Sequence, residues 1–199
     1  MRKLTLSMQL SLDGYVEGPA GEMDWFVDDD EIWKEMFEFL ESIDTILLGA
    51  GMYPGYVDYW RGVLSDPKAR PDEVKYSKLA SKIEHIVFSN RLSKIDPNAP
   101  DDYQGEWRKN TRIVKGDVKT EVLKLKQSSS GKDIVLWGGA SMASSLIELG
   151  LIDEYRFSVN QIILGGGKPL FHRGAKHSLK LIGSKTYKSG VVLLHYKAI

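Results

Sequence analysis

The stretch Asp133–Leu146, DIVLWGGASMASSL, decides the fold that this chain is expected to adopt. It begins with a short apolar run, Ile134 to Trp137, that ends at two glycines, and such a run is typical of a strand buried on both faces. After the glycines, Met142, Leu146 and Leu149 recur at the spacing of one helix face. The stretch therefore predicts a strand, a glycine turn and a helix.

The two glycines at the turn, Gly138 and Gly139, permit two interpretations. Glycines at a helix N-terminus let backbone N–H groups approach an anion, and the unpaired donors and the helix dipole favour negative charge there, so a phosphate group is the expected guest. Alternatively, the glycines supply only the positive φ or the close packing that a tight turn requires. The pair alone does not separate these interpretations.

The composition is that of an ordinary soluble globular protein, since 42% of the 199 residues are hydrophobic and 27% are charged. This length fits a single domain, residues 1–199, which can bury a substantial core. Basic and acidic residues number 27 each, so no net field draws the chain to nucleic acid or to an anionic membrane. Neither is expected as a partner.

Cysteine usage and the N-terminus bear on the location of the protein. The chain has no cysteine, which excludes disulfides and thiolate metal sites and suits the cytoplasm. The N-terminal MRKLTLSMQLSLDGY alternates apolar and polar residues, unlike a signal peptide, and no apolar run approaches the length of a membrane span. Only His172 and His177 are closely spaced, and a surface loop explains them, so no metal site is expected.

The N-terminal half predicts strands and helices in alternation. Apolar and polar residues alternate from Leu4 to Leu12, which places the leucines on one face of a strand. A helix is expected over residues 28–42, with acidic residues at its start and an apolar stripe made by Ile32, Trp33, Met36, Phe37 and Leu40. Residues 45–49 predict a buried strand. Residues 50–71 are expected to form a loop rich in aromatic residues and prolines.

The rest of the chain continues this alternation up to Gly150. A helix with Val74, Leu79 and Ile83 directed inward precedes strands at HIVFSNR and TRIVKG, and a second helix follows Asp117. Alternating strands and helices favour a largely parallel sheet covered on both faces. After Gly150 the chain offers strands and tight turns without a helix, which predicts antiparallel strands at the end of the sheet.

Three of the expected strands end in glycine or polar residues. These ends are LLGAGM at residues 47–52, FSNR at residues 88–91 and WGGASM at residues 137–142. In a parallel sheet, ligands bind outside the carboxyl ends of the strands. The agreement among the three ends favours the phosphate interpretation of the two glycines.

The order of the motifs SLDGYV, TILLGAGMY, HIVFSNR and IVLWGGASMASSLIELGLIDEYRFSVNQIILGGGKPLF resembles the dihydrofolate reductase-like superfamily. Within it, the chain is most similar to the C-terminal reductase domain of bifunctional riboflavin-biosynthesis enzymes, 5-amino-6-(5-phosphoribosylamino)uracil reductase. GGAS, LIDE and ILGGGKPLF are the specific part. The resemblance implies an α/β fold, a three-layer αβα sandwich around a mixed, mostly parallel sheet with antiparallel C-terminal strands. It also implies NADPH as hydride donor and a homodimer.

The resemblance also implies cofactor-binding residues in four groups. Those expected to approach the cofactor phosphates are Gly49, Ala50, Gly51 and Met52. Those expected around the adenosine ribose are Ser89, Asn90 and Arg91. Those expected to cradle the pyrophosphate, often with a cis bond between the glycines, are Gly138, Gly139, Ala140, Ser141 and Met142. Those expected near the nicotinamide are Gln9, Asp13 and Val16.

Arg91 decides the expected preference for NADPH. A guanidinium at this position forms paired hydrogen bonds to a 2′-phosphate. The alternative is a solvated surface arginine beside a turn.

For the substrate, the resemblance implies that Trp25 faces the bound molecule and that Asp30 is the catalytic acid. A carboxylate in a partly desolvated pocket has a raised pKa and relays the proton that reduction of a C=N or C=O bond needs. Alternatively, Asp30 is an ordinary solvated acid at a helix N-terminus. The aromatic residues of the expected loop are assigned either to stacking on a flat heterocycle or to a dimer seam, and they are Tyr53, Tyr56, Tyr59 and Trp60.

Two differences from the proteins that this chain resembles narrow the range of possible substrates. Folate reductases carry an arginine ahead of the strand at HIVFS, where this chain offers only Lys82. The loop after Gly49 lacks the basic pattern that the riboflavin-pathway reductases use for the ribose phosphate, so Arg61, Lys68 or Arg70 replaces it or the substrate lacks a phosphate. The leading hypothesis is an NADPH-dependent reductase of a small heterocyclic or carbonyl substrate. The alternatives are dihydrofolate reductase and a non-catalytic nucleotide-binding or dimerisation module.

Overall fold

The computed structural model describes residues 1–92, 107, 109–171 and 176–199. Its strands are β1 (Leu4–Leu10), β2 (Tyr15–Glu17), β3 (Ile43–Gly49), β4 (Glu84–Phe88), β5 (Thr111–Val114), β6 (Asp133–Gly138), β7 (Glu154–Val159), β8 (Lys168–Pro169), β9 (Leu179–Thr186) and β10 (Val192–Ala198). Its helices are α1 (Asp30–Ser42), α2 (Tyr53–Ser65), α3 (Pro71–Ala80), α5 (Val118–Gln127) and α6 (Ala140–Glu148).

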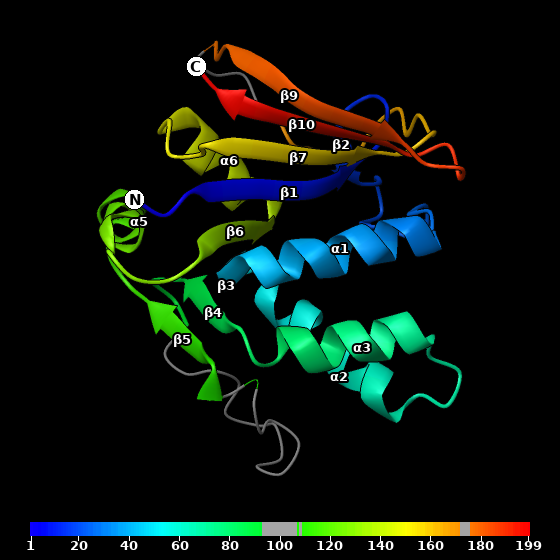
Figure 1. Cartoon of the computed structure of the whole chain (residues 1–199), viewed down its shortest axis with the longest axis horizontal. Coiled ribbons are helices and arrows are strands. Elements are labelled where there is room, and N and C mark those ends of the chain that lie inside the picture. The colour runs from blue at the N-terminus through cyan, green and yellow to red at the C-terminus, as the bar shows by residue number, and fades with distance from the viewer. Residues whose placement is uncertain (93–106, 108, 172–175) are drawn as a thin grey trace.

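One sheet organises the molecule, with the strand order β5-β4-β3-β6-β1-β7-β10-β9 (Figure 1). The strands from β5 to β7 run parallel, and β10 runs antiparallel to both β7 and β9. The predicted mixed, mostly parallel sheet with antiparallel pairing at its C-terminal end is therefore confirmed. Because β9 reverses again relative to β10, β10 alone opposes the common direction in this sheet.

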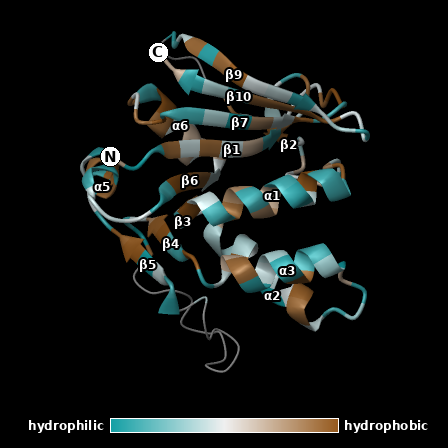
Figure 2. Cartoon of the chain, viewed as in Figure 1, coloured by the Kyte–Doolittle hydropathy of each residue, from teal (hydrophilic) through white to brown (hydrophobic). Residues whose placement is uncertain are grey.

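Helices cover the sheet on two faces and make three layers. Leu47 of β3 packs in one cluster with Val122 of α5 and Leu146 of α6. Its neighbour Ile46 packs in the other cluster with Tyr56 of α2. Figure 2 shows the hydrophobic colour concentrated on β3, β4 and β6, as expected for strands buried on both faces. None of the helices in the described ranges is long and apolar enough to cross a membrane.

The first strand is shorter than its alternation predicts. Leu4, Leu6 and Leu10 are buried, but β1 ends at Leu10 and Leu12 is 66% exposed. The chain turns directly after the strand, where the Gly14 N–H donates to the Ser11 carbonyl at 3.0 Å. The placement of Leu12 in the strand is therefore wrong.

The expected loop after β3 is also wrong, because residues 53–65 form α2. Its proline lies in the first turn, where a missing N–H costs nothing. The buried residues recur at helical spacing, and they are Tyr53, Tyr56, Val57, Arg61 and Val63. Aromatic residues that suggested a loop are thus part of a helix that packs on the sheet.

The inward face of α3 and the residue after α6 differ from the prediction. In α3 the buried side chains include Tyr76 and Ala80, one turn apart, whereas Leu79 is 39% exposed. At the end of α6, Ile147 is buried and Leu149 is 42% exposed. In α3, Leu79 therefore lies off the inward face, whereas the predicted face of α6 is confirmed at the buried Leu146 and wrong only at Leu149, which follows the helix.

Candidate functional site

The two glycine motifs meet where β3 and β6 end. A Cβ atom added to Gly49 would lie 3.2 Å from the Gly139 nitrogen and 3.5 Å from the Met142 Cβ. The Gly138–Gly139 peptide bond is cis, as the resemblance implies. The absence of a Cβ at Gly49 eases this close approach, and the predicted phosphate-binding and pyrophosphate-binding groups therefore lie together at the carboxyl ends of β3 and β6.

The N-terminus of α6 opens onto this contact. Gly139 is the N-cap, and its carbonyl accepts hydrogen bonds from the Met142 and Ala143 N–H groups, both at 3.0 Å. The first N–H groups of a helix have no intrahelical acceptor, so that of the exposed Ser141 remains available as a donor in this turn, whereas Ala140 is fully buried. Such a donor, together with the helix dipole, suits an anion.

Two methionines pack against Gly138. This residue has a φ of +139°, and an added Cβ would lie 2.6 Å from the Met52 sulfur and 3.8 Å from the Met8 Cε. Met52 is the N-cap of α2, and Met8 comes from β1. A Cβ added to Gly51 would meet nothing within 4 Å, so the backbone beside Met52 borders open space.

Ser89, Asn90 and Arg91 form the turn after β4, next to β3 in the sheet. The Ser89 hydroxyl accepts hydrogen bonds from the Arg91 N–H at 3.1 Å and the Leu92 N–H at 2.9 Å. The Asn90 side-chain oxygen, Oδ1, accepts from the Gly116 N–H at 3.0 Å. Both polar side chains therefore shape the turn, and the exposed Arg91 side chain lies on it.

Asp13 joins the segment after β1 to the glycine-rich run that precedes β8. Its carboxylate accepts hydrogen bonds from the Leu164 N–H at 3.1 Å, the Gly165 N–H at 2.8 Å and the Ser11 hydroxyl at 2.7 Å. Desolvation works to raise the pKa of Asp13, but the hydrogen bonds outweigh it and lower the pKa below its ordinary value. Asp13 is thus an ionised carboxylate that links these two segments.

Val16, the other residue expected near the nicotinamide after β1, lies in the hydrophobic core at 4% exposure.

Asn160, directly after β7, is a polar residue that the sequence analysis missed. It is 1% exposed, and its side-chain N–H donates to the Gln9 side-chain oxygen at 2.8 Å. Its own side-chain oxygen accepts from the Val27 N–H at 3.2 Å. Asn160 therefore connects Gln9 to the end of the loop that carries Trp25. An asparagine directly after an alternating strand was the available signal, but it did not reveal the partner.

Trp25 packs within its own loop. Its indole N–H donates to the Glu22 carbonyl at 3.1 Å, and its ring meets Phe26 edge-on at 4.5 Å. Whether it faces a substrate stays a prediction.

Asp30 lies in a different environment from the expected one. Its side chain is 86% exposed and accepts a hydrogen bond from the Arg70 guanidinium at 2.6 Å. The expectation of a partly desolvated pocket is therefore wrong, because Asp30 is the first residue of α1 and points to solvent. Its role as an acid stays a prediction that this exposure does not favour.

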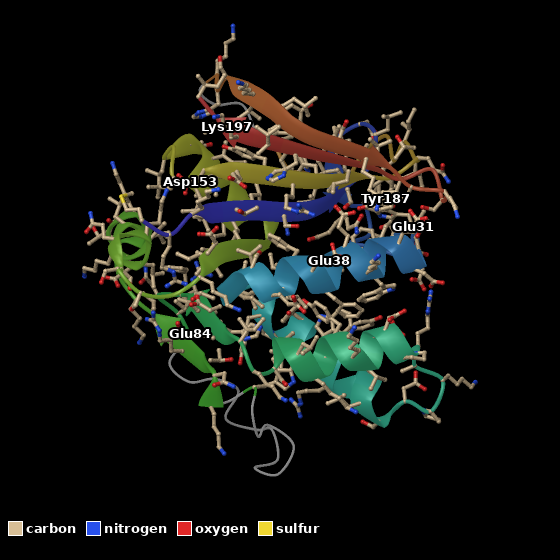
Figure 3. The ribbon with its side chains drawn as sticks, viewed as in Figure 1. Glu31, Glu38, Glu84, Asp153, Tyr187 and Lys197 are labelled. Atoms are coloured by element: carbon tan, nitrogen blue, oxygen red, sulfur yellow. The ribbon has the colours of Figure 1, made fainter. Side chains whose placement is uncertain are left out.

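Glu35 is a second missed residue, on the face of α1 that looks toward β7 and the β9–β10 hairpin. Its carboxylate accepts hydrogen bonds from the Tyr187 hydroxyl at 2.6 Å and the Lys185 ammonium at 3.1 Å, and the Arg156 guanidinium lies at 3.5 Å. Arg156 also lies over the Phe39 ring, 4.7 Å from its centroid. Figure 3 shows Tyr187 beside the end of α1 that carries Glu31.

These contacts hold Glu35 in its charged form. Burial works to raise the pKa of Glu35, but the bonds from Tyr187 and Lys185 and the charge of Arg156 together lower it. Burial, with Glu35 adding to it, raises the pKa of Tyr187. At neutral pH Glu35 is therefore an anion and Tyr187 a neutral donor. Glu35 lies three residues after Ile32 and four before Phe39, and this helical spacing, outside the predicted stripe, was the available sequence signal.

The aromatic residues of α2 serve the core more than a ligand. Tyr53 and Tyr56 are buried, and the Tyr56 hydroxyl lies 2.9 Å from that of Tyr76. Tyr59 is 56% exposed, and its hydroxyl donates to Glu73 at 3.0 Å. Neither stacking on a heterocycle nor a dimer seam is open to the buried Tyr53 and Tyr56, so that expectation is wrong for them.

Two of the three basic residues considered for a substrate phosphate are already paired. Arg61 is buried and lies 3.3 Å from Asp58. Arg70 binds Asp28 as well as Asp30. Lys68 is exposed.

Comparison with known proteins gives the relationship. The family model described as the RibD C-terminal domain matches residues 2–193. The Bacillus subtilis (strain 168) protein YyaP, itself uncharacterized, is 35% identical over 196 residues, which cover 98% of this chain and 94% of YyaP.

Solved structures share the fold. A Shewanella sp. PV-4 protein named for riboflavin biosynthesis superposes with a TM-score of 0.74 at 20% identity, over 100% of this chain and 99% of that one. The Thermotoga maritima diaminohydroxyphosphoribosylaminopyrimidine deaminase/5-amino-6-(5-phosphoribosylamino)uracil reductase gives 0.67 at 14% identity, over 100% and 57%. The Enterococcus faecalis dihydrofolate reductase complexed with NADP(H) gives 0.57 at 13% identity, over 98% and 96%. With the family match across nearly its whole length, the chain belongs to the RibD C-terminal domain family.

Proposed function

We propose that this protein is an NADPH-dependent reductase that transfers hydride to a small heterocyclic or carbonyl substrate. The observation that carries the proposal is the contact of Gly49 with the Gly138–Gly139 turn at the N-terminus of α6, beside Gly51, which borders open space. A phosphate-bearing cofactor suits such an edge. The reductase activity in the name of the Thermotoga maritima relative and the NADP(H) bound to the Enterococcus faecalis enzyme support the same function.

In this proposal the protein binds and orients the cofactor and the substrate, and NADPH, when bound, supplies the hydride. The Ser141 N–H in the first turn of α6 holds the pyrophosphate, and the Arg91 guanidinium holds the 2′-phosphate. Gln9, at the end of β1, borders the nicotinamide.

Replacement of Arg91 by alanine tests the cofactor preference. Loss of paired, charge-assisted hydrogen bonds is expected to weaken NADPH binding by about ten- to a hundredfold, with a much smaller effect on NADH. Titration of both nucleotides by protein fluorescence measures this difference. Arg112→Ala is the matched control, because Arg112 is a half-exposed arginine of β5 that pairs with Glu84. Equal losses for NADPH and NADH would remove the assignment of Arg91.

Replacement of Asp30 by asparagine tests the proton donor. Because the carboxylate is exposed and paired with Arg70, we expect kcat to change by less than about threefold, a result that would remove Asp30 as the proton donor. Steady-state NADPH oxidation at several pH values measures this. A drop of about a hundredfold or more, the range of a lost general acid, would restore Asp30 to the catalytic role.

Dihydrofolate reduction is the second candidate, favoured by the superposition on the Enterococcus faecalis enzyme. NADPH oxidation with dihydrofolate and with 5-amino-6-(5-phosphoribosylamino)uracil separates the two. Faster turnover of the ribosylaminouracil supports the first candidate. NADPH binding without turnover of either supports the non-catalytic module.

We also propose a homodimer and a cytoplasmic location, both of which rest on the resemblance and the composition. Light scattering of the purified protein measures the first.

A further inference from the structure

Asn160 makes all of its hydrogen bonds, backbone and side chain, to other groups of the protein. Its backbone N–H donates to the Leu10 carbonyl at 2.7 Å, and its backbone carbonyl accepts from the Ile162 N–H at 2.9 Å. With 1% of its surface exposed, the residue has no access to bulk water. A buried amide of this kind needs protein partners for both its oxygen and its nitrogen.

Those partners allow one orientation of the Asn160 amide. The side-chain nitrogen lies near three oxygens, those of Gln9 at 2.8 Å and of the Ser158 and Leu10 carbonyls at 3.2 and 3.4 Å. The side-chain oxygen faces the Val27 N–H at 3.2 Å. Backbone carbonyls only accept and backbone N–H groups only donate, so a flipped amide would oppose oxygen to oxygen and N–H to N–H.

This orientation dictates that of Gln9. The Asn160 N–H requires an acceptor, so Gln9 must direct its oxygen toward Asn160 and its NH₂ group away from it. Gln9 is half-buried near the end of β1, paired in register with Ser158. Its side chain lies on the opposite face of the strand from its neighbour Met8, which packs against the Gly138 turn. A freely rotating glutamine offers donor or acceptor, whereas this one offers only donors.

We propose that Asn160 is a positioning residue that fixes Gln9 as a hydrogen-bond donor to a carbonyl oxygen of the bound ligand. The inference rests on the proposed function and deepens it, since it names the chemistry recognised beside the end of β1. The oxygen belongs either to the carboxamide of the nicotinamide or to a ring carbonyl of the substrate. An amino group at the same place is rejected, because it would set donor against donor.

The variant Gln9→Glu tests the donor. It keeps an acceptor for Asn160 but replaces the NH₂ group with a second oxygen that repels a carbonyl. The matched control is Gln161→Glu, which makes the same change at an exposed neighbour. Calorimetric titration uses two probes, NADPH and 2′-phospho-ADP-ribose, which lacks the nicotinamide.

The outcomes separate the two sources of the oxygen. A loss of about tenfold or more for NADPH with no change for phospho-ADP-ribose assigns the contact to the carboxamide. If binding of both nucleotides is unchanged while the KM for the ribosylaminouracil rises by about tenfold or more, the contact belongs to the substrate. Values that match the Gln161→Glu control throughout overturn the inference. A wild-type protein that binds neither nucleotide refutes the proposed function itself.

Asn160→Asp tests the positioning. A carboxylate at this place still accepts from Val27 but no longer donates to Gln9, so Gln9 turns its NH₂ group inward and its oxygen toward the ligand. We expect the same ligand-selective loss as in Gln9→Glu, and we expect it to vanish in a Gln9→Ala background. Additive losses in the double variant, or equal losses for NADPH and phospho-ADP-ribose, would mean that Asn160 only supports the fold. If Asn160→Asp does not fold, Gln9→Glu still decides whether Gln9 is the donor.

Discussion

Replacing Gly138 with alanine will weaken NADPH binding by more than about tenfold and lower the free energy of unfolding by about 1–3 kcal/mol. The residue has a φ of +139°, a region that residues with a Cβ rarely adopt, and the new methyl group would lie 2.6 Å from the Met52 sulfur. Relief of this contact must move either Met52, at the start of α2, or the turn that leads into α6. Because the positive φ strains an alanine whether or not the Met52 side chain moves, the turn is expected to shift, and that shift displaces the backbone donor proposed for the pyrophosphate.

Urea denaturation and nucleotide titration measure the two effects of Gly138→Ala. Gly62→Ala is the control for the same chemical change, because Gly62 is exposed in α2 and an added Cβ would meet nothing within 4 Å. There alanine is expected to raise stability by up to about 1 kcal/mol through its helix propensity. A Gly138→Ala protein with the stability and NADPH affinity of the wild type would mean that the turn has no role in binding.

Acidification from pH 6.5 to pH 4 will remove about 3 kcal/mol of stability through His85 alone. The imidazole is fully buried on β4, and burial lowers its pKa from 6.5 to about 4, although the hydrogen bond to the Ile83 carbonyl acts in the other direction. The unfolded chain therefore takes up a proton below pH 6.5, while the folded protein resists it down to about pH 4. The stability is fully present above pH 6.5 and is lost as the pH falls through this window.

The surroundings of the His85 ring explain why the folded protein does not protonate it. One ring nitrogen of His85 lies 2.9 Å from the Ile83 carbonyl, so it is assigned the N–H. The other, Nε2, has no hydrogen-bond partner among the residues that the structure describes, and the ring lies near Tyr56 and Trp107, with centroids 5.8 and 5.1 Å away. A proton on Nε2 would leave a buried charge without an acceptor.

Urea denaturation of the wild type and of His85→Gln at pH 7.5, 5.5 and 4.5 isolates this contribution. Glu35 and Glu154, whose pKa values are lowered, also stabilise the folded state. Their contribution is lost at still lower pH, in the wild type and the variant alike. The wild type is expected to lose about 1.4 kcal/mol more per pH unit than the variant. Parallel curves for the two proteins would show that His85 does not titrate across this window.

The strand, turn and helix of residues 133–146 were predictable because their signals are local. A continuous apolar run indicates a strand buried on both faces, and two glycines indicate the turn, independently of the rest of the sequence. The end of β1 had no such local signal, because Leu12 continues the alternation although the chain already turns between Ser11 and Gly14. In α2, Pro54 and the aromatic residues outweighed a helical spacing that was present all along.

Side-chain roles were less predictable than elements. Asp30 and Glu35 belong to the same helix, yet Asp30 in the first turn points to solvent while Glu35 bonds Tyr187, and the contacts that decide this come from β7 and the β9–β10 hairpin. The link from Asn160 to Gln9 depends on the register between β1 and β7, which no short stretch of sequence specifies. Motif order therefore located the backbone of the candidate site, whereas the polar contacts around it required the tertiary structure.

The polar ties around the end of β1 have a consequence for synthesis of the chain. Gln9 meets Asn160 across 151 positions, and Asp13 meets Gly165 across 152. Closing segments this far apart is slow and waits for the distal partner. We therefore expect a nascent polypeptide halted before residue 160 to collapse around β3, β4 and β6 while remaining incompetent for ligand capture, a competence that arrives only as the last fifth of the protein emerges.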